Sequence, residues 1–105
     1  MTRVAALVAA MCCANVLAAD PPPPGRLKAQ MCATCHGPLG VSSAPDAPHL
    51  AGQPKIYLTA QLKAFRSGTR RHEVMNVIAK PLSDEDIEAL ADWYSSLAVD
   101  AREKR

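Results

Sequence analysis

One short segment, Cys32-Ala33-Thr34-Cys35-His36, constrains the fold more than any other part of the chain. Two thiols three positions apart, followed at once by a histidine, form the pattern through which haem is attached covalently. The thiols add to the two haem vinyl groups as thioethers, and their spacing places both sulfurs along one edge of the porphyrin. The adjacent imidazole then lies under the iron as an axial ligand. We therefore expect one covalently attached haem c per chain, held by Cys32 and Cys35 and ligated by His36.

Other interpretations of these five residues explain less of the sequence. A thioredoxin-type site needs a βαβ context, and no strand pattern lies nearby. A structural zinc site needs two more ligands at finger-like spacing; no cysteine follows Cys35, and His49 and His72 are not paired at short spacing. A plain disulfide is compatible with an oxidising compartment but leaves His36 without a role.

The N-terminal residues 1–19 have the composition of a secretory signal peptide. Arg3 provides a positive start, residues 4–16 form an almost uncharged apolar run, and small residues precede Asp20. The run is short for a membrane span, although an uncleaved anchor is the alternative. We expect cleavage near this point and a periplasmic protein.

The remainder is expected to form one domain. Residues 20–24 read as a proline-rich linker and residues 25–105 as the folded domain. The domain is small for a self-sufficient core, so a bound haem would supply apolar surface that the chain lacks. The net charge of +2 falls to +1 when Arg3 is removed. A nearly neutral domain argues against nucleic acid as a partner, and no second long apolar segment predicts a membrane span.

The hydrophobic spacing predicts an all-α protein with three main helices and long loops. Proline and glycine mark helix ends, and Ser83 is expected to cap the last helix. The loop at 37–53 is long for so small a domain, and we expect a haem edge to organise it. The predicted helices are 25–32, 54–65 and the stretch after Ser83, with one or two further helical turns at 74–79.

The second axial ligand must come from far along the chain. The candidates are Met31, His49, His72 and Met75. Met31 adjoins the attachment motif on the proximal side and cannot easily cross to the opposite face. Met75 lies in a segment that could be laid over the haem, and a thioether ligand there would raise the reduction potential. Position favours Met75, but His72 stays open as the other serious candidate.

Several further stretches carry a resemblance to a known family. They are Cys-Ala-Thr-Cys-His-Gly at 32–37, Pro-His-Leu-Ala-Gly-Gln at 48–53, Phe65-Arg66, Met75, and Leu-Ser-Asp-Glu-Asp-Ile at 82–87 followed by Trp93-Tyr94. The region from 25 to 97 resembles a class I c-type cytochrome of the small bacterial periplasmic monohaem type, similar to one half of the periplasmic dihaem cytochromes.

The resemblance implies a small cytochrome c fold wrapped around one haem, with His36 and Met75 as the axial ligands. It implies that the carbonyl of Pro48 accepts the imidazole N–H of His36, which fixes the ring and raises its basicity. It also implies that the first and last helices cross near Gly25.

An iron with two protein ligands has no vacant position, so we expect a one-electron carrier and not an enzyme. Its partners would be a redox protein donor and an acceptor that dock transiently at the exposed haem edge. Two alternatives are a haem-bearing relay subunit of a larger periplasmic oxidoreductase, and a haem enzyme or gas sensor with an open sixth position.

Charged residues are segregated along the sequence and suggest a means of steering such partners. Solvated faces with no such role are the alternative interpretation. The basic group is Lys63, Arg66, Arg70 and Arg71, and the acidic group on the last helix is Asp84, Glu85, Asp86, Glu88 and Asp92.

Overall fold

The computed structural model describes residues 17–104, and these contain helices and loops but no strand. The prediction of an all-α protein is therefore confirmed. Most of the predicted signal peptide lies outside the described residues. The helices are α1 (Pro24–Lys28), the 3₁₀ helix η1 (Ala29–Met31), α2 (Ala33–His36), α3 (Lys55–Ser67), α4 (Glu73–Ala79) and α5 (Asp84–Ser95).

The first predicted helix is a row of three short pieces, α1, η1 and α2, rather than one continuous helix. It begins at Pro24, where the absent N–H costs nothing, and it runs on to His36. Gly37 ends the row with a φ of 87°. A Cβ at this position would stand 2.0 Å from the carbonyl oxygen of Val41. Only glycine therefore allows the chain to turn directly after His36.

The bounds of the two longer helices lie where the sequence indicates. Pro54 precedes α3, and Gly68 terminates it with a φ of 83°. Ser83 caps α5: its hydroxyl accepts from the Asp86 N–H at 3.0 Å, and the Asp86 carboxylate accepts from the Ser83 N–H at 3.0 Å. This reciprocal capping box satisfies two N–H groups that the helix itself cannot pair.

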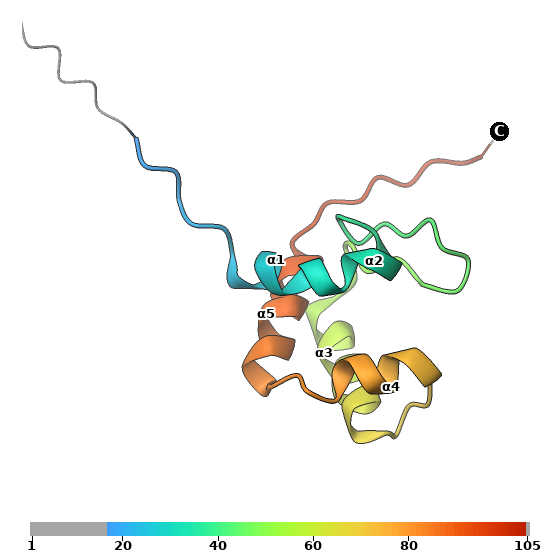
Figure 1. The fold of residues 1–105 in the computed structure, drawn as a ribbon. Coiled ribbons are helices and arrows are strands. Elements are labelled where there is room, and N and C mark those ends of the chain that lie inside the picture. Colours follow the sequence, from blue (N-terminus) through green and yellow to red (C-terminus); the bar gives the residue numbers. More distant parts are fainter. Residues whose placement is uncertain (1–16, 105) are drawn as a thin grey trace, which may run out of the picture.

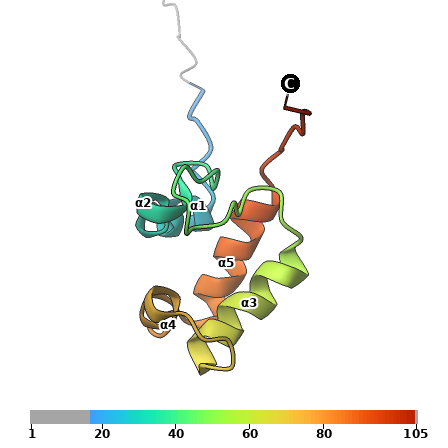
Figure 2. The same ribbon diagram turned by 90° about the vertical axis from the view of Figure 1, so that its right-hand side faces the viewer.

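The helices form two layers. Figure 2 shows α3 and α5 side by side, with the α1–α2 row and α4 on the same side of that pair. In Figure 1 the α1–α2 row crosses in front of one end of the α3–α5 pair, and α4 lies in front of the other end. The core is small and centred on α5, where Ile87 is fully buried and Leu90 is 1% exposed. The predicted crossing of the first and last helices is present, because Gly25 is buried against the backbone of α5 at Ala89.

Ion pairs connect α5 to its neighbours and modify the predicted charge pattern. Cations from α1 and α3 contact four of the five acidic residues, in the pairs Lys28–Asp86, Lys55–Glu88, Lys55–Asp92 and Arg66–Asp84. Exposed pairs of this kind stabilise a fold little. They do, however, neutralise much of the acidic face, chiefly through Lys28 and Lys55, and one pair, Arg66–Asp84, joins the two charge groups directly.

Candidate cofactor site

Helix α2 places the two thiols and the imidazole of the attachment motif on one turn. Cys32 stands at its N-cap, half-buried against the core, and Cys35 is exposed. Both thiols are free, so the disulfide interpretation is not adopted. Burial raises the pKa of the Cys32 thiol, against smaller opposing effects from the Tyr94 hydroxyl and Lys28. The described residues hold no group of three His, Cys, Asp or Glu that could bind a metal ion.

His36 is oriented by the loop that follows it. The side chain is 7% exposed, and its Nδ1 lies 2.8 Å from the carbonyl oxygen of Pro48. A carbonyl can only accept, so Nδ1 carries the proton and Nε2 keeps its lone pair. No hydrogen bond among the described residues uses Nε2. The ring is therefore fixed in the tautomer that a metal ligand requires, with its donor atom free.

The loop at 38–53 is organised by protein contacts. The carbonyl of Gly40 accepts the N–H groups of Leu50 at 2.7 Å and Ala51 at 3.0 Å, and the Gly52 N–H donates to the Tyr94 carbonyl at 2.8 Å. A Cβ at Gly40 would stand 2.7 Å from the Tyr94 ring. From the sequence we expected a haem edge to organise this loop, but Tyr94 of α5 also holds it in place. The sequence could not reveal this role because loop and helix are distant along the chain.

His49 is engaged within this same loop. Its Nδ1 accepts the N–H of Ser42 at 2.8 Å, and the Ser42 hydroxyl donates to the Cys35 carbonyl at 3.0 Å. The first bond joins two loop residues on either side of Pro48, and the second attaches the loop to α2. His49 thus belongs to the support around His36, and the structure does not bring it to α4.

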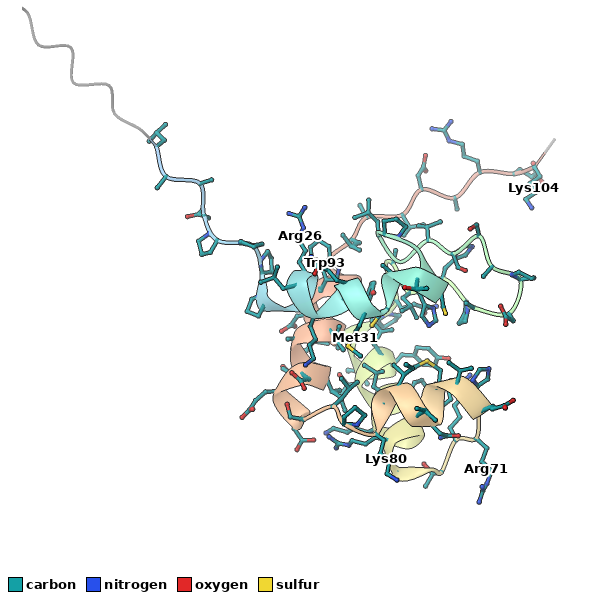
Figure 3. All side chains as sticks on the ribbon, viewed as in Figure 1. Arg26, Met31, Arg71, Lys80, Trp93 and Lys104 are labelled. Atoms are coloured by element: carbon teal, nitrogen blue, oxygen red, sulfur yellow. The ribbon has the colours of Figure 1, made fainter. Side chains whose placement is uncertain are left out.

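Helix α4 carries the two remaining ligand candidates. Met75 is half-buried and packs against the core. His72 is exposed and caps the helix: its Nδ1 accepts the Met75 N–H at 3.2 Å. Figure 3 shows Met31 on the N-terminal row, and Arg71 and Lys80 at the two ends of α4.

The side chains on this side of the molecule suit a covalently bound haem. They include two free thiols three positions apart, an imidazole with its Nε2 available, and a thioether on a separate helix. On the α1–α2 row, Cys35 is exposed and Met31 is 44% exposed.

The profile of the cytochrome c family matches residues 25–98. The chain is 43% identical over 75 residues to cytochrome c-554(548) of Halomonas halodenitrificans, covering 69% of this chain and 90% of that protein. It is 41% identical over 69 residues to a thiosulfate dehydrogenase electron acceptor of Stutzerimonas stutzeri, covering 63% of this chain and 32% of that protein. The chain thus spans about a third of the length of that relative.

The structure is similar to that of reduced recombinant cytochrome c4 from Pseudomonas stutzeri. The TM-score is 0.67 and the sequence identity 37%, and the match covers 70% of this chain and 44% of that chain.

Proposed function

This chain belongs to the cytochrome c family, and from that premise we propose that it is a periplasmic one-electron carrier with His36 and Met75 as its axial ligands. Membership of the family implies a covalently bound haem c. The observation that carries the proposal is the geometry of His36, whose Nδ1 is bound to Pro48 and whose Nε2 is left free directly after the two attachment thiols.

Each residue of the site has a distinct task. Cys32 and Cys35 hold the group covalently, so that it cannot dissociate outside the cytoplasm. The Pro48 carbonyl keeps the proton of His36 on Nδ1 and makes Nε2 a better donor. Bound haem c supplies exchange of one electron between two oxidation states of its iron. A second ligand from Met75 leaves no open position for oxygen or substrate.

Three features support Met75 over the histidines as the second ligand. Its thioether lies half-buried on the core side of α4, whereas His72 is exposed. The Nδ1 atoms of His72 and His49 accept backbone N–H groups, so in their neutral rings Nε2 carries the proton and, unlike Nε2 of His36, has no free lone pair. A thioether needs no deprotonation to donate and suits a buried position.

The test is the ligand signature of the ferric holoprotein. The wild type should show the weak near-infrared methionine-to-iron charge-transfer band. Met75→Ala should lose this band, lower the reduction potential and allow cyanide to bind. His72→Ala is the matched control and should change none of these. If His72→Ala removes the band and Met75→Ala does not, the assignment moves to His72. A wild type that binds cyanide readily would favour an enzyme or gas sensor.

The periplasmic location rests on the predicted signal peptide. Among residues 17–104, no helix is long and apolar enough to cross a membrane. Export is tested by fractionation: the protein should be released with the periplasmic contents in a haem-bearing form. Protein that stays with the membrane fraction would indicate the uncleaved anchor instead.

Redox partners are proposed to dock transiently at the exposed edge beside Cys35. One of the four basic charges that could steer them is paired, because Arg66 contacts Asp84. Arg70 is bound to the neutral amide of Gln61 at 2.6 Å and stacked over Phe65, so it keeps its charge. Arg71 has no ion pair among residues 17–104 and is exposed.

The test of steering compares two variants that remove one charge each. Arg71→Gln should slow bimolecular electron transfer at low ionic strength and matter little at high salt, because salt screens exposed charges. Lys104→Gln lies in the C-terminal tail, away from the helices (Figure 3), and should leave the rate unchanged. Equal effects of the two variants would rule out local steering.

The identity to a thiosulfate dehydrogenase electron acceptor favours a second candidate function, a relay subunit that serves one catalytic chain. The two functions differ in the strength of association. A free carrier should elute alone in gel filtration at physiological salt, whereas a subunit should co-elute with a catalytic partner in a salt-resistant complex.

A further inference from the structure

The side chain of Asn76 attaches the start of α4 to α3 by hydrogen bonds. Its Nδ2 donates to the carbonyl oxygens of Phe65 and Arg70, both at 2.8 Å. Its Oδ1 accepts the backbone N–H of His72 at 2.8 Å. A carboxamide offers two donors and one acceptor oxygen, so all three groups are used. Asn76 thereby joins the end of α3, the connecting turn and the first residue before α4.

The same contacts fix the conformation of His72. Its carbonyl accepts the Asn76 N–H at 3.0 Å, and its Nδ1 accepts the Met75 N–H at 3.2 Å. Its ring meets the Phe65 ring edge-on, with centroids 6.3 Å apart. His72 is thus held from its backbone and from its ring in the role of helix cap. Its imidazole faces the first turn of α4, where Nδ1 accepts the Met75 N–H.

Two side chains that can bind iron, His72 and Met75, therefore stand three residues apart on a helix whose first turn is set by Asn76. We infer that Asn76 is a positioning residue that selects Met75 over His72 as the ligand that α4 presents. This inference rests on the proposed function, in which Met75 ligates the haem iron. Asn76 would act through His72 and Met75, because its three side-chain hydrogen bonds go to protein backbone groups.

The physical reason lies in what the loss of Asn76 would release. The carbonyls of Phe65 and Arg70 and the N–H of His72 would lose their partners, and the connecting turn would separate from α3. His72 would then be free to leave its capping position and swing its imidazole toward the iron. An imidazole is a stronger donor than a thioether, so the ligand preference would shift once the restraint is gone.

The test uses purified holoprotein with Asn76→Leu, which keeps the branching of the side chain and removes all three hydrogen bonds. The methionine-to-iron band should weaken or disappear, and the reduction potential should fall. The cyanide association constant should fall by roughly tenfold, because the stronger imidazole ligand is harder to displace; this is the size expected for losing hydrogen bonds at a partly buried site. Asn76→Asp keeps the acceptor for His72 and removes both donors, so it should give an intermediate result if Asn76→Leu does not fold.

The rescue variant is Asn76→Leu combined with His72→Asn. Asparagine is a good helix cap and lacks an imidazole, so the methionine band should return in the double variant. The matched control for general destabilisation is Ser83→Ala, which removes the cap of α5 and should lower the melting temperature while leaving the band intact.

Two outcomes separate this inference from the proposed function. If the wild type lacks a methionine signature, the proposed ligand is wrong and the inference falls with it. If the wild type has the signature and Asn76→Leu keeps it while melting at a lower temperature, Asn76 is only structural. Failure of His72→Asn to restore the band would also overturn the inference.

Discussion

The crossing of α1 and α5 predicts that Gly25→Ala destabilises the protein, although helix propensity predicts the opposite. Gly25 lies within α1, where replacing glycine by alanine in isolation would stabilise by about 1 kcal/mol. In the folded protein, a Cβ at this position would stand 2.0 Å from the Ala89 carbonyl oxygen and 2.7 Å from the Trp93 Cβ. The obstacle is helix backbone, which cannot rotate away as a flexible side chain could.

The magnitude follows from the shift that the helices would need. Ordinary contact requires about 3.5 Å, so the two helices must separate by roughly 1.5 Å at the point where Gly25 is buried. Overpacking of this kind typically costs about 1–3 kcal/mol. After subtraction of the propensity gain, we expect a net loss of about 2 kcal/mol at the upper end of that range. In a domain of this size such a loss lowers the melting temperature by about 8–16 °C.

The assay is thermal unfolding of the holoprotein followed by circular dichroism. Gly68→Ala is the control, because nothing lies within 4 Å of a Cβ at that position. Its only expected cost is the backbone strain of an alanine at a φ of 83°, about 1 kcal/mol. Gly25→Ala should melt well below Gly68→Ala. A Gly25→Ala variant that melts at or above the wild-type temperature would refute the close crossing of the two helices.

Three further predictions concern the core, the cofactor and pH. Leu90→Ala should destabilise the holoprotein by about 2–5 kcal/mol in chemical denaturation, because Leu90 is 1% exposed and its loss leaves a cavity; a smaller loss would mean that the core collapses around the gap. Replacement of Cys32 and Cys35 by alanine should yield an apoprotein with much less helix by circular dichroism, since the core is small, and a cooperatively melting apoprotein would contradict this. The Arg66 guanidinium lowers the pKa of Asp84 from its ordinary 3.8, so the unfolded chain binds the proton more tightly. The Asp84 carboxylate therefore stabilises the folded state above pH 3.8, and this contribution is lost as the pH falls through the lowered pKa of the folded protein. Asp84→Asn should flatten part of the decline of melting temperature with acid, and an unchanged pH profile would count against the pairing.

The sequence by itself determined the chemistry and most of the helices. The attachment motif is local, because two thiols and an imidazole within one turn need no distant residue to be recognised. Helix ends at Gly68 and Ser83 were predictable for the same reason, since caps and stops act over a few residues. The first helix was predicted as one continuous piece, whereas the structure breaks it at η1.

Tertiary structure decided how the site is supported. The charge groups that look separate along the sequence are joined by the Arg66–Asp84 pair between α3 and α5, and the loop that carries Pro48 is bound to Tyr94. Asn76 reads in the sequence as an ordinary polar residue beside Met75, but its three partners lie on two different segments. Local patterns encode which residue types are present and where helices start and stop. The packing of the helices decides which backbone groups still need a hydrogen-bond partner. The positioning of the proposed ligands is therefore a property of the folded chain.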